Sequence, residues 1–187
     1  MANERITAEK FYSDFVENFN KKKQSCDLAG NWYSDAFWTN LMLNNPDSIV
    51  KEIAYKNNLK FFAESWKIDA LLCRIDDNIE LQKEGEFTRE YDYLCNAEVV
   101  VEVENSYKFF IQDEVYKLSL INCPLKVGIT YIERTDEKFI NKAQKRIKEI
   151  IDKKYSYCPE NSNNEYLIII IRGPENLDCQ KWIYRFI

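Results

Sequence analysis

The sequence contains no histidine among its 187 residues. This absence excludes Ser-His-Asp and Cys-His catalytic arrangements, histidine-ligated zinc and imidazole general bases. Glycine and proline are also scarce, at four each, which argues against collagen-like, linker-rich and low-complexity chains. Neither a P-loop nor a dinucleotide-binding glycine motif occurs. Any catalysis must therefore depend on carboxylates, lysines, tyrosines or a metal held by oxygen ligands.

Long apolar segments are missing as well. The longest candidate, residues 166–171, has the length of a strand, whereas a membrane span needs about 20 apolar residues. Residues 1–5 lack the apolar region of a signal peptide. We therefore expect a cytoplasmic protein without a membrane partner. No C-x-x-C pair occurs among the six cysteines, so buried thiols in a reducing compartment are expected rather than a zinc site.

The composition is that of one globular domain, with 45% hydrophobic and 30% charged residues. A net charge of −5 argues against a protein that coats nucleic acid indiscriminately, but it leaves room for a local basic surface. We predict a single domain over residues 1–187, with N-terminal helices in 1–57 and an α/β core in 58–187.

Apolar periodicity predicts the elements of this domain. Helical spacing indicates helices over 7–23, 32–42 and 46–54, and again over 111–122 and 136–154. Strand-like runs occur at 59–64, 66–75, 97–104, 125–132, 165–171 and 182–187. The acid-rich segment 76–92 is predicted to be an exposed excursion. Short apolar strands alternating with helices favour a mixed central sheet flanked by helices, with a helical addition at the N-terminus.

Two carboxylates occur together at the end of the clearest strand, AEVVVEVE at 97–104. Glu102 and Glu104 lie on the same face, with Cα atoms roughly 6.5–7 Å apart, and can converge on one hard cation. The alternative is an ordinary solvated face. Asp69 interrupts the apolar run 66–73, where aspartate has poor strand propensity. It is either a ligand or a strand-end residue paired with Lys67 or Arg74.

The ordered combination resembles the PD-(D/E)XK nuclease superfamily, whose fold is called restriction-endonuclease-like. The resemblance rests on Asp69, on E-V-E at 102–104 of the next long strand, on a following helix that carries Lys117, and on LKVGITYI at 125–132. The run VEVENS at 101–106 is similar to an E-x-E-N variant branch of small bacterial proteins. The resemblance covers about 59–131 and does not extend to the first 45 residues. It implies an α-β-β-β-α-β core and Mg²⁺-dependent hydrolysis of DNA phosphodiester bonds.

Carried over to this chain, the resemblance makes Asp69 the shared metal ligand and Glu102 the second ligand. Mn²⁺ is the expected substitute for Mg²⁺. Glu104 stands where the superfamily usually has lysine, and it is a candidate general base or ligand for a second metal.

The missing lysine charge has three candidate sources, namely Lys117, Lys67 and Lys126. Lys117 is preferred because its helix follows the E-x-E strand directly, although an amphipathic helix also carries solvated lysines. Glu64 or Glu52 is a candidate upstream acid.

DNA is the expected partner, and the region 138–154 has a local charge of +5 that can follow a phosphate backbone. Its basic residues are Lys138, Lys142, Lys145, Arg146, Lys148, Lys153 and Lys154. The alternative is a solvated helix face. Lys21 to Lys23 form a second small basic patch, and the aromatic cluster Trp32, Tyr33, Phe37 and Trp38 is interpreted as core or interface rather than as a base-stacking surface.

Three functions are left open by the sequence. The first is a Mg²⁺-dependent deoxyribonuclease in which Asp69, Glu102, Glu104 and Lys117 act. The second is a catalytically inactive nuclease-fold protein that binds nucleic acid or a protein subunit. The third is an unrelated α/β interaction protein whose acids are structural. A homodimer or larger complex is compatible with each.

Overall fold

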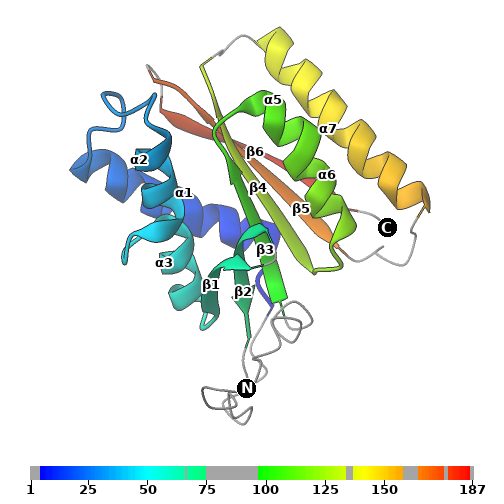
Figure 1. The fold of residues 1–187 in the computed structure, drawn as a ribbon, viewed down its shortest axis with the longest axis horizontal. Coiled ribbons are helices and arrows are strands. Elements are labelled where there is room, and N and C mark those ends of the chain that lie inside the picture. Colours follow the sequence, from blue (N-terminus) through cyan, green and yellow to red (C-terminus); the bar gives the residue numbers. More distant parts are fainter. Residues whose placement is uncertain are drawn as a thin grey trace.

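Six strands form one mixed sheet, in the order in which they occur along the chain (Figure 1). The computed structural model describes residues 5–65, 67–74, 97–133, 137–157, 164–174 and 177–185. The strands are β1 (Lys60–Ser65), β2 (Ile68–Cys73), β3 (Ala97–Glu104), β4 (Leu125–Ile132), β5 (Glu165–Arg172) and β6 (Asp178–Arg185). β1, β2 and β3 pair antiparallel, β3, β4 and β5 pair parallel, and β6 closes the sheet antiparallel to β5.

The predicted strands at 97–104 and 125–132 coincide with β3 and β4. The last strand is longer than its apolar pattern indicated, because β6 begins at Asp178 rather than at Trp182. Its first residues are mostly polar, and they pair with β5 along an edge where only one side of the strand has a neighbour. Backbone pairing therefore extends this edge strand beyond its apolar residues. The predicted excursion at 76–92 lies outside the described residues.

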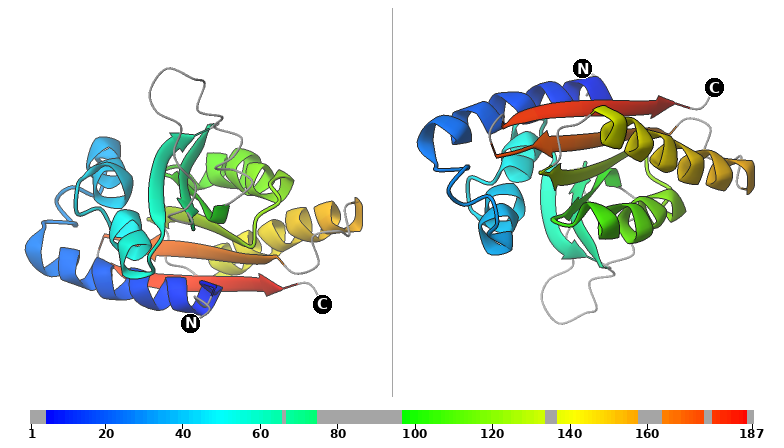
Figure 2. Two further views of the ribbon diagram at one scale, coloured as in Figure 1. Left: turned by 90° about the horizontal axis from the view of Figure 1, so that it is seen from below. Right: turned by 90° about the horizontal axis from the view of Figure 1, so that it is seen from above.

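The N-terminal helices cover one face of the sheet. They comprise α1 (Ala8–Ser25), α2 (Asp35–Thr39), the π-helical turn η1 (Asn40–Asn44) and α3 (Ile49–Lys56). Thr7 caps α1 by accepting a hydrogen bond from the Lys10 N–H at 3.2 Å. Phe11, Phe15 and Phe19 are buried at helical spacing and share one apolar core with this face of β3, β4 and β5. Figure 2 shows α1 running beside β5 and β6.

Shorter helices and one long helix cover the opposite face. They are α5 (Tyr107–Phe109), the π-helical turn η2 (Phe110–Glu114), α6 (Val115–Leu120) and α7 (Glu137–Tyr157). The helix predicted over 111–122 begins four residues earlier and ends at Leu120. In α7, Ile140, Ala143 and Ile147 are buried. The α/β class and the helix-flanked mixed sheet are confirmed.

The structure also bears on the predictions of buried thiols and of a chain without membrane spans. Cys73 and Cys123 are buried, and Cys26 and Cys179 are partly buried. Cys95 and Cys158 fall outside the described residues. Within the described parts of the chain, no helix has the length and apolar character required to cross a membrane.

Gly128 of β4 is fixed by close packing rather than by its backbone angles. A Cβ at this position would lie 2.6 Å from Phe110 Cζ and 3.2 Å from Ile168 Cδ1. Gly128→Ala should therefore lower the free energy of unfolding by about 1–3 kcal/mol, because a buried ring must move. Urea denaturation measures the change. Adding Phe110→Leu, which removes the ring, should make the alanine less costly, and equal costs in both backgrounds would contradict this account.

Candidate carboxylate site

The antiparallel pairing of β2 and β3 brings the start of one strand beside the end of the other. Ala70 lies opposite Val101, so Asp69 is in register with Glu102. The backbone N–H of Val103 donates a hydrogen bond of 2.7 Å to Asp69 Oδ2. Because side chains alternate between the two faces of a strand, both carboxylates lie on the face of the sheet that α6 covers. The structure thus places two of the predicted site residues side by side.

Lys117 of α6 reaches this pair. Its Nζ lies 3.0 Å from Glu102 Oε1 and 2.6 Å from Glu114 Oε2. It also donates a hydrogen bond of 2.7 Å to the backbone carbonyl of Lys67, a residue with φ of 60° in the turn between β1 and β2. The preferred lysine is therefore next to Glu102, and Lys67 contributes its carbonyl oxygen to the same ammonium.

Glu104 has different partners. Its Oε1 accepts a hydrogen bond from the Ser106 N–H at 2.7 Å, and its carbonyl oxygen accepts one from Thr130 Oγ1 at 2.8 Å. Among the described residues it has no hydrogen bond or ion pair with Asp69 or Glu102. Its role as general base or metal ligand stays a prediction.

The remaining sequence candidates lie elsewhere. Lys126 is fully buried, and its Nζ donates a hydrogen bond of 2.9 Å to the Tyr166 hydroxyl on β5. Glu52 is exposed on α3, which covers the other face of the sheet. The side chain of Glu64 falls outside the described residues.

Glu102 is buried in an unfavourable environment. Its side chain has no solvent exposure, and neither carboxylate oxygen accepts a hydrogen bond of regular geometry from the described residues. Burial raises the pKa of Glu102, the neighbouring Asp69 raises it further, and Lys117 only partly offsets both effects. Burial also raises the pKa of Asp69. Three carboxyl groups, from Asp69, Glu102 and Glu114, thus share one ammonium group.

Asp14 shows how the same protein buries a carboxylate for structural purposes. It is 1% exposed and is bound by Lys10 Nζ at 2.8 Å, Lys56 Nζ at 2.8 Å and Asn57 Nδ2 at 2.9 Å. Burial alone would raise the pKa of Asp14, but these three partners outweigh burial and lower it. Glu102 lacks such compensation. Under-compensated carboxylates are typical of functional sites.

The donor set suits a hard divalent cation. Within the described ranges, no three or more His, Cys, Asp or Glu side chains are arranged as a preformed metal site. Mg²⁺, however, is usually held by one or two carboxylates together with waters and substrate phosphates. Asp69 and Glu102 provide two adjacent carboxylates, and the oxygens of Glu102 have unused acceptor capacity. Asp69 and Glu102 are therefore suitable ligands for a Mg²⁺ ion.

The predicted basic surface is exposed along α7. Lys138, Lys142, Lys145 and Lys148 face solvent, and Arg146 forms an ion pair of 3.2 Å with Glu149. The helix packs beside α6, which carries Lys117 (Figure 1). The basic surface and the carboxylate pair are therefore on the same side of the sheet.

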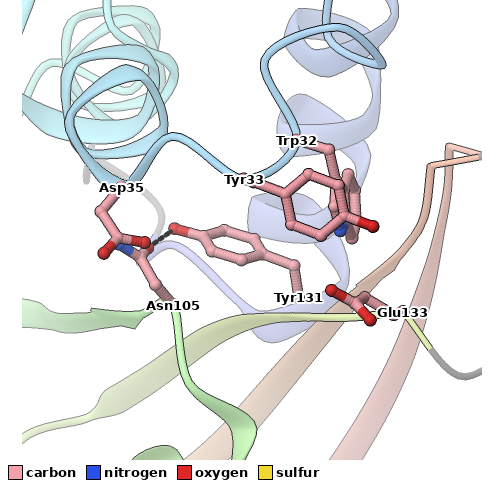
Figure 3. A pocket seen from close by; sticks show the side chains of 6 residues that line it. All are labelled: Trp32, Tyr33, Asp35, Asn105, Tyr131 and Glu133. Carbon is pink, nitrogen blue, oxygen red and sulfur yellow. Dashed lines mark hydrogen bonds between the residues drawn. The ribbon is translucent and has the colours of Figure 1, made fainter.

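Sequence reasoning missed a pocket of about 150 Å³ that is lined by residues of three separate segments (Figure 3). The lining residues are Trp32, Tyr33, Asp35, Asn105, Tyr131 and Glu133. Trp32 and Trp38 are buried, as the core interpretation expected, whereas Tyr33 is 78% exposed. Asn105 directly follows Glu104, but nothing in the sequence links it to residues 32–35.

Neither a scan against protein-family models nor searches of curated proteins and solved structures matches this chain.

Proposed function

We propose that this protein is a metal-dependent nuclease that hydrolyses DNA phosphodiester bonds with Mg²⁺ held by Asp69 and Glu102. The observation that carries the proposal is the excess, among the described residues, of fully or partly buried carboxyl groups over ammonium groups at the junction of β2 and β3. A divalent cation would supply the missing positive charge. Leaving ionised carboxylates buried without compensation costs several kcal/mol per ion, so a neutralising partner is expected.

The topology supports the same proposal. Three antiparallel strands, a helical segment and a parallel strand follow one another from β1 to β4, with helices before them. This order is compatible with the α-β-β-β-α-β core implied by the sequence resemblance. Asp69 and Glu102 occupy the positions in β2 and β3 that the resemblance assigned to metal ligands.

In this proposal, each residue of the site has a distinct role in hydrolysis. When bound, a divalent cation polarises a phosphoryl oxygen and lowers the pKa of a coordinated water. Asp69 is oriented by the Val103 N–H, and Lys117 is oriented by the carbonyl of Lys67. The ammonium of Lys117 can donate a proton in a hydrogen bond to a phosphate oxygen or to the attacking water. Glu104 is the candidate general base.

A specific observation favours the alternative of a catalytically inactive protein with the same fold. Lys117 already forms an ion pair with Glu102, so its ammonium can stand permanently in place of a metal. Such a protein would bind nucleic acid or a protein subunit and would not cleave DNA.

The experiment that tests the proposal compares the wild type with Asp69→Asn on single-stranded, duplex and branched DNA. Low salt and Mg²⁺ or Mn²⁺ are used because phosphate contacts weaken with ionic strength. We expect cleavage by the wild type and a loss of about 100-fold or more in the variant, as for other groups that stabilise a transition state. Asp113→Asn, an exposed carboxylate on η2, is the matched control and should cleave normally.

A Mn²⁺ titration by calorimetry separates the two candidate functions. The nuclease proposal requires binding by the wild type and its loss in Glu102→Gln. Absence of both metal binding and cleavage, with DNA binding unchanged in Asp69→Asn, would establish the inactive alternative.

A further inference from the structure

The pocket between α2 and the ends of β3 and β4 is built on a rigid aromatic base. The Trp32 and Tyr131 rings are each 6% exposed, with centroids 6.2 Å apart at an angle of 70°. Trp38 stacks on Tyr131 with centroids 4.7 Å apart. Trp32 also packs against Gly173, where a Cβ would lie 1.9 Å from its ring. The buried rings are therefore held in place before any ligand arrives.

The rim of the pocket is polar and acidic. The carboxylates of Asp35 and Glu133 are exposed, and neither has a hydrogen bond or ion pair among the residues that the structure describes. In Figure 3 the exposed ring of Tyr33 lies in front of Trp32, with Glu133 beside it and Asp35 near Asn105. The Tyr131 hydroxyl donates a hydrogen bond to Asn105 Oδ1. Aromatic faces and unpaired carboxylates thus border one cavity.

More negative charge lies nearby. Burial raises the pKa of Tyr131, and the charges of Asp35, Glu104 and Asp69 raise it further. The pocket therefore has a negative electrostatic environment on more than one side. A ligand that carries phosphate would meet repulsion there, because no lysine or arginine is among the lining residues that the structure describes.

We propose that this pocket binds the guanidinium group of an alkylguanidine, supplied either by a free small molecule or by an arginine side chain of a partner protein. A guanidinium is planar, is weakly hydrated and stacks on aromatic faces, and its N–H groups match carboxylate oxygens. Tyr33 offers an exposed ring face, and Asp35 and Glu133 offer acceptors. A lysine-type ammonium is more strongly hydrated and has no plane to stack, so it fits this combination less well.

The proposal does not rest on the nuclease function. Its residues come from the start of α2 and the segment just before it, and from the ends of β3 and β4, on the face that the N-terminal helices cover, whereas Lys117 lies on the opposite face. Asp69→Asn should consequently leave guanidinium binding intact, even where it abolishes cleavage.

Butylguanidine and the peptide Gly-Gly-Arg-Gly-Gly are the probes, with neutral butylurea and butylamine as matched controls. Binding is followed by calorimetry and by the tryptophan fluorescence of the full chain, because Trp32 lines the pocket. We expect butylguanidine to bind at least about tenfold more tightly than either control, which corresponds to 1.4 kcal/mol. A peptide that binds more tightly than butylguanidine assigns the ligand to a protein partner, and equal affinities assign it to a small molecule.

Variants tie the binding to the pocket. The double variant Asp35→Asn with Glu133→Gln should weaken butylguanidine binding about tenfold or more, and Tyr33→Ala should weaken it several-fold. The matched controls are Asp113→Asn with Glu149→Gln, two exposed carboxylates elsewhere, and Tyr55→Ala, a tyrosine that is 60% exposed on α3.

Three results would overturn the proposal. They are equal binding of butylguanidine and butylurea, affinities unchanged by the pocket variants, and tighter binding of deoxynucleoside monophosphates than of butylguanidine. The last result would assign the pocket to a nucleobase instead. All pocket substitutions are at exposed side chains, so circular dichroism should show an unchanged fold.

Discussion

Replacing Lys117 with methionine should lower the free energy of unfolding by about 3 kcal/mol at pH 10 and by less at pH 7, because burial and Asp69 raise the pKa of Glu102 to about 9 in the folded protein. Methionine retains most of the apolar stem of lysine but removes the ammonium group. Glu102 then has no cation beside it, although its side chain is completely buried, and Glu114 loses its partner as well. Removing one member of a buried ion pair is costly because the other charge stays behind.

The pH dependence follows from the sign of the Glu102 shift. Its pKa is raised in the folded protein by burial and by Asp69. Below the pKa of an unfolded glutamate, near 4.3, the group is protonated in both states. As the pH rises above that value, the unfolded chain releases the proton while the folded protein retains it, so the free energy of unfolding falls. In the wild type this fall ends near the folded-state pKa of Glu102, about 9. Without Lys117 that pKa rises further and the fall continues to higher pH, so the two proteins differ increasingly above about pH 9.

Urea denaturation at several pH values between 7 and 10 measures the effect. Adding Glu102→Gln should recover much of the lost stability, because the amide needs no counter-charge. Lys148→Met on α7 is the matched control, since that lysine is 59% exposed and its ion pair with Asp152 should contribute little. A loss for Lys117→Met that does not vary with pH would mean that it arises from packing and not from charge.

Much of the fold was readable from local pattern because the buried strands are almost continuous apolar runs. The eight residues of β3 and of β4 were predicted without error in their bounds, since each run begins and ends where apolar character does. β6 was placed too late because an edge strand also gains hydrogen bonds for its polar residues. Periodicity does not report backbone pairing with a neighbouring strand.

The pair formed by Asp69 and Glu102 could also be predicted from the sequence. Alternation along a strand fixes the face of Glu102, and the sequence resemblance implied that Asp69 lies near it. The preference for Lys117 rested on the helix that follows β3, and the structure places this side chain at Glu102. Glu114 was missed because its position becomes relevant only when α6 packs over the sheet. The pocket around Tyr131 was missed because three segments that are far apart in the sequence form it.

Lys126 gives the second prediction with a large effect, in the opposite direction. The double variant Lys126→Met with Tyr166→Phe should raise the free energy of unfolding by about 2–3 kcal/mol at pH 7. Lys126 is fully buried, and burial lowers the pKa of its ammonium from 10.5 to about 8. Cys123 lies nearby, and the Tyr166 ring is 4.6 Å from the Lys126 Nζ, but neither prevents this decrease in the pKa of Lys126. A shift of this size corresponds to about 3 kcal/mol at 1.36 kcal/mol per pH unit.

The free energy of unfolding depends on pH in the way expected for a base whose pKa is lower in the folded protein than in the unfolded chain. Between pH 8 and 10.5 the unfolded chain binds more protons than the folded protein, so the wild type should gain stability as the pH rises through this window. Below pH 8 the full cost of charging the buried lysine is present. The double variant should lack this gain, and Tyr166→Phe is included so that the hydroxyl is not left without its Lys126 partner.

Thermal denaturation of both proteins from pH 7 to 10 measures the difference, which should shrink steadily toward high pH. Parallel pH profiles would show that the buried ammonium carries no such cost, and in that case the contact with Tyr166 must compensate its burial in full.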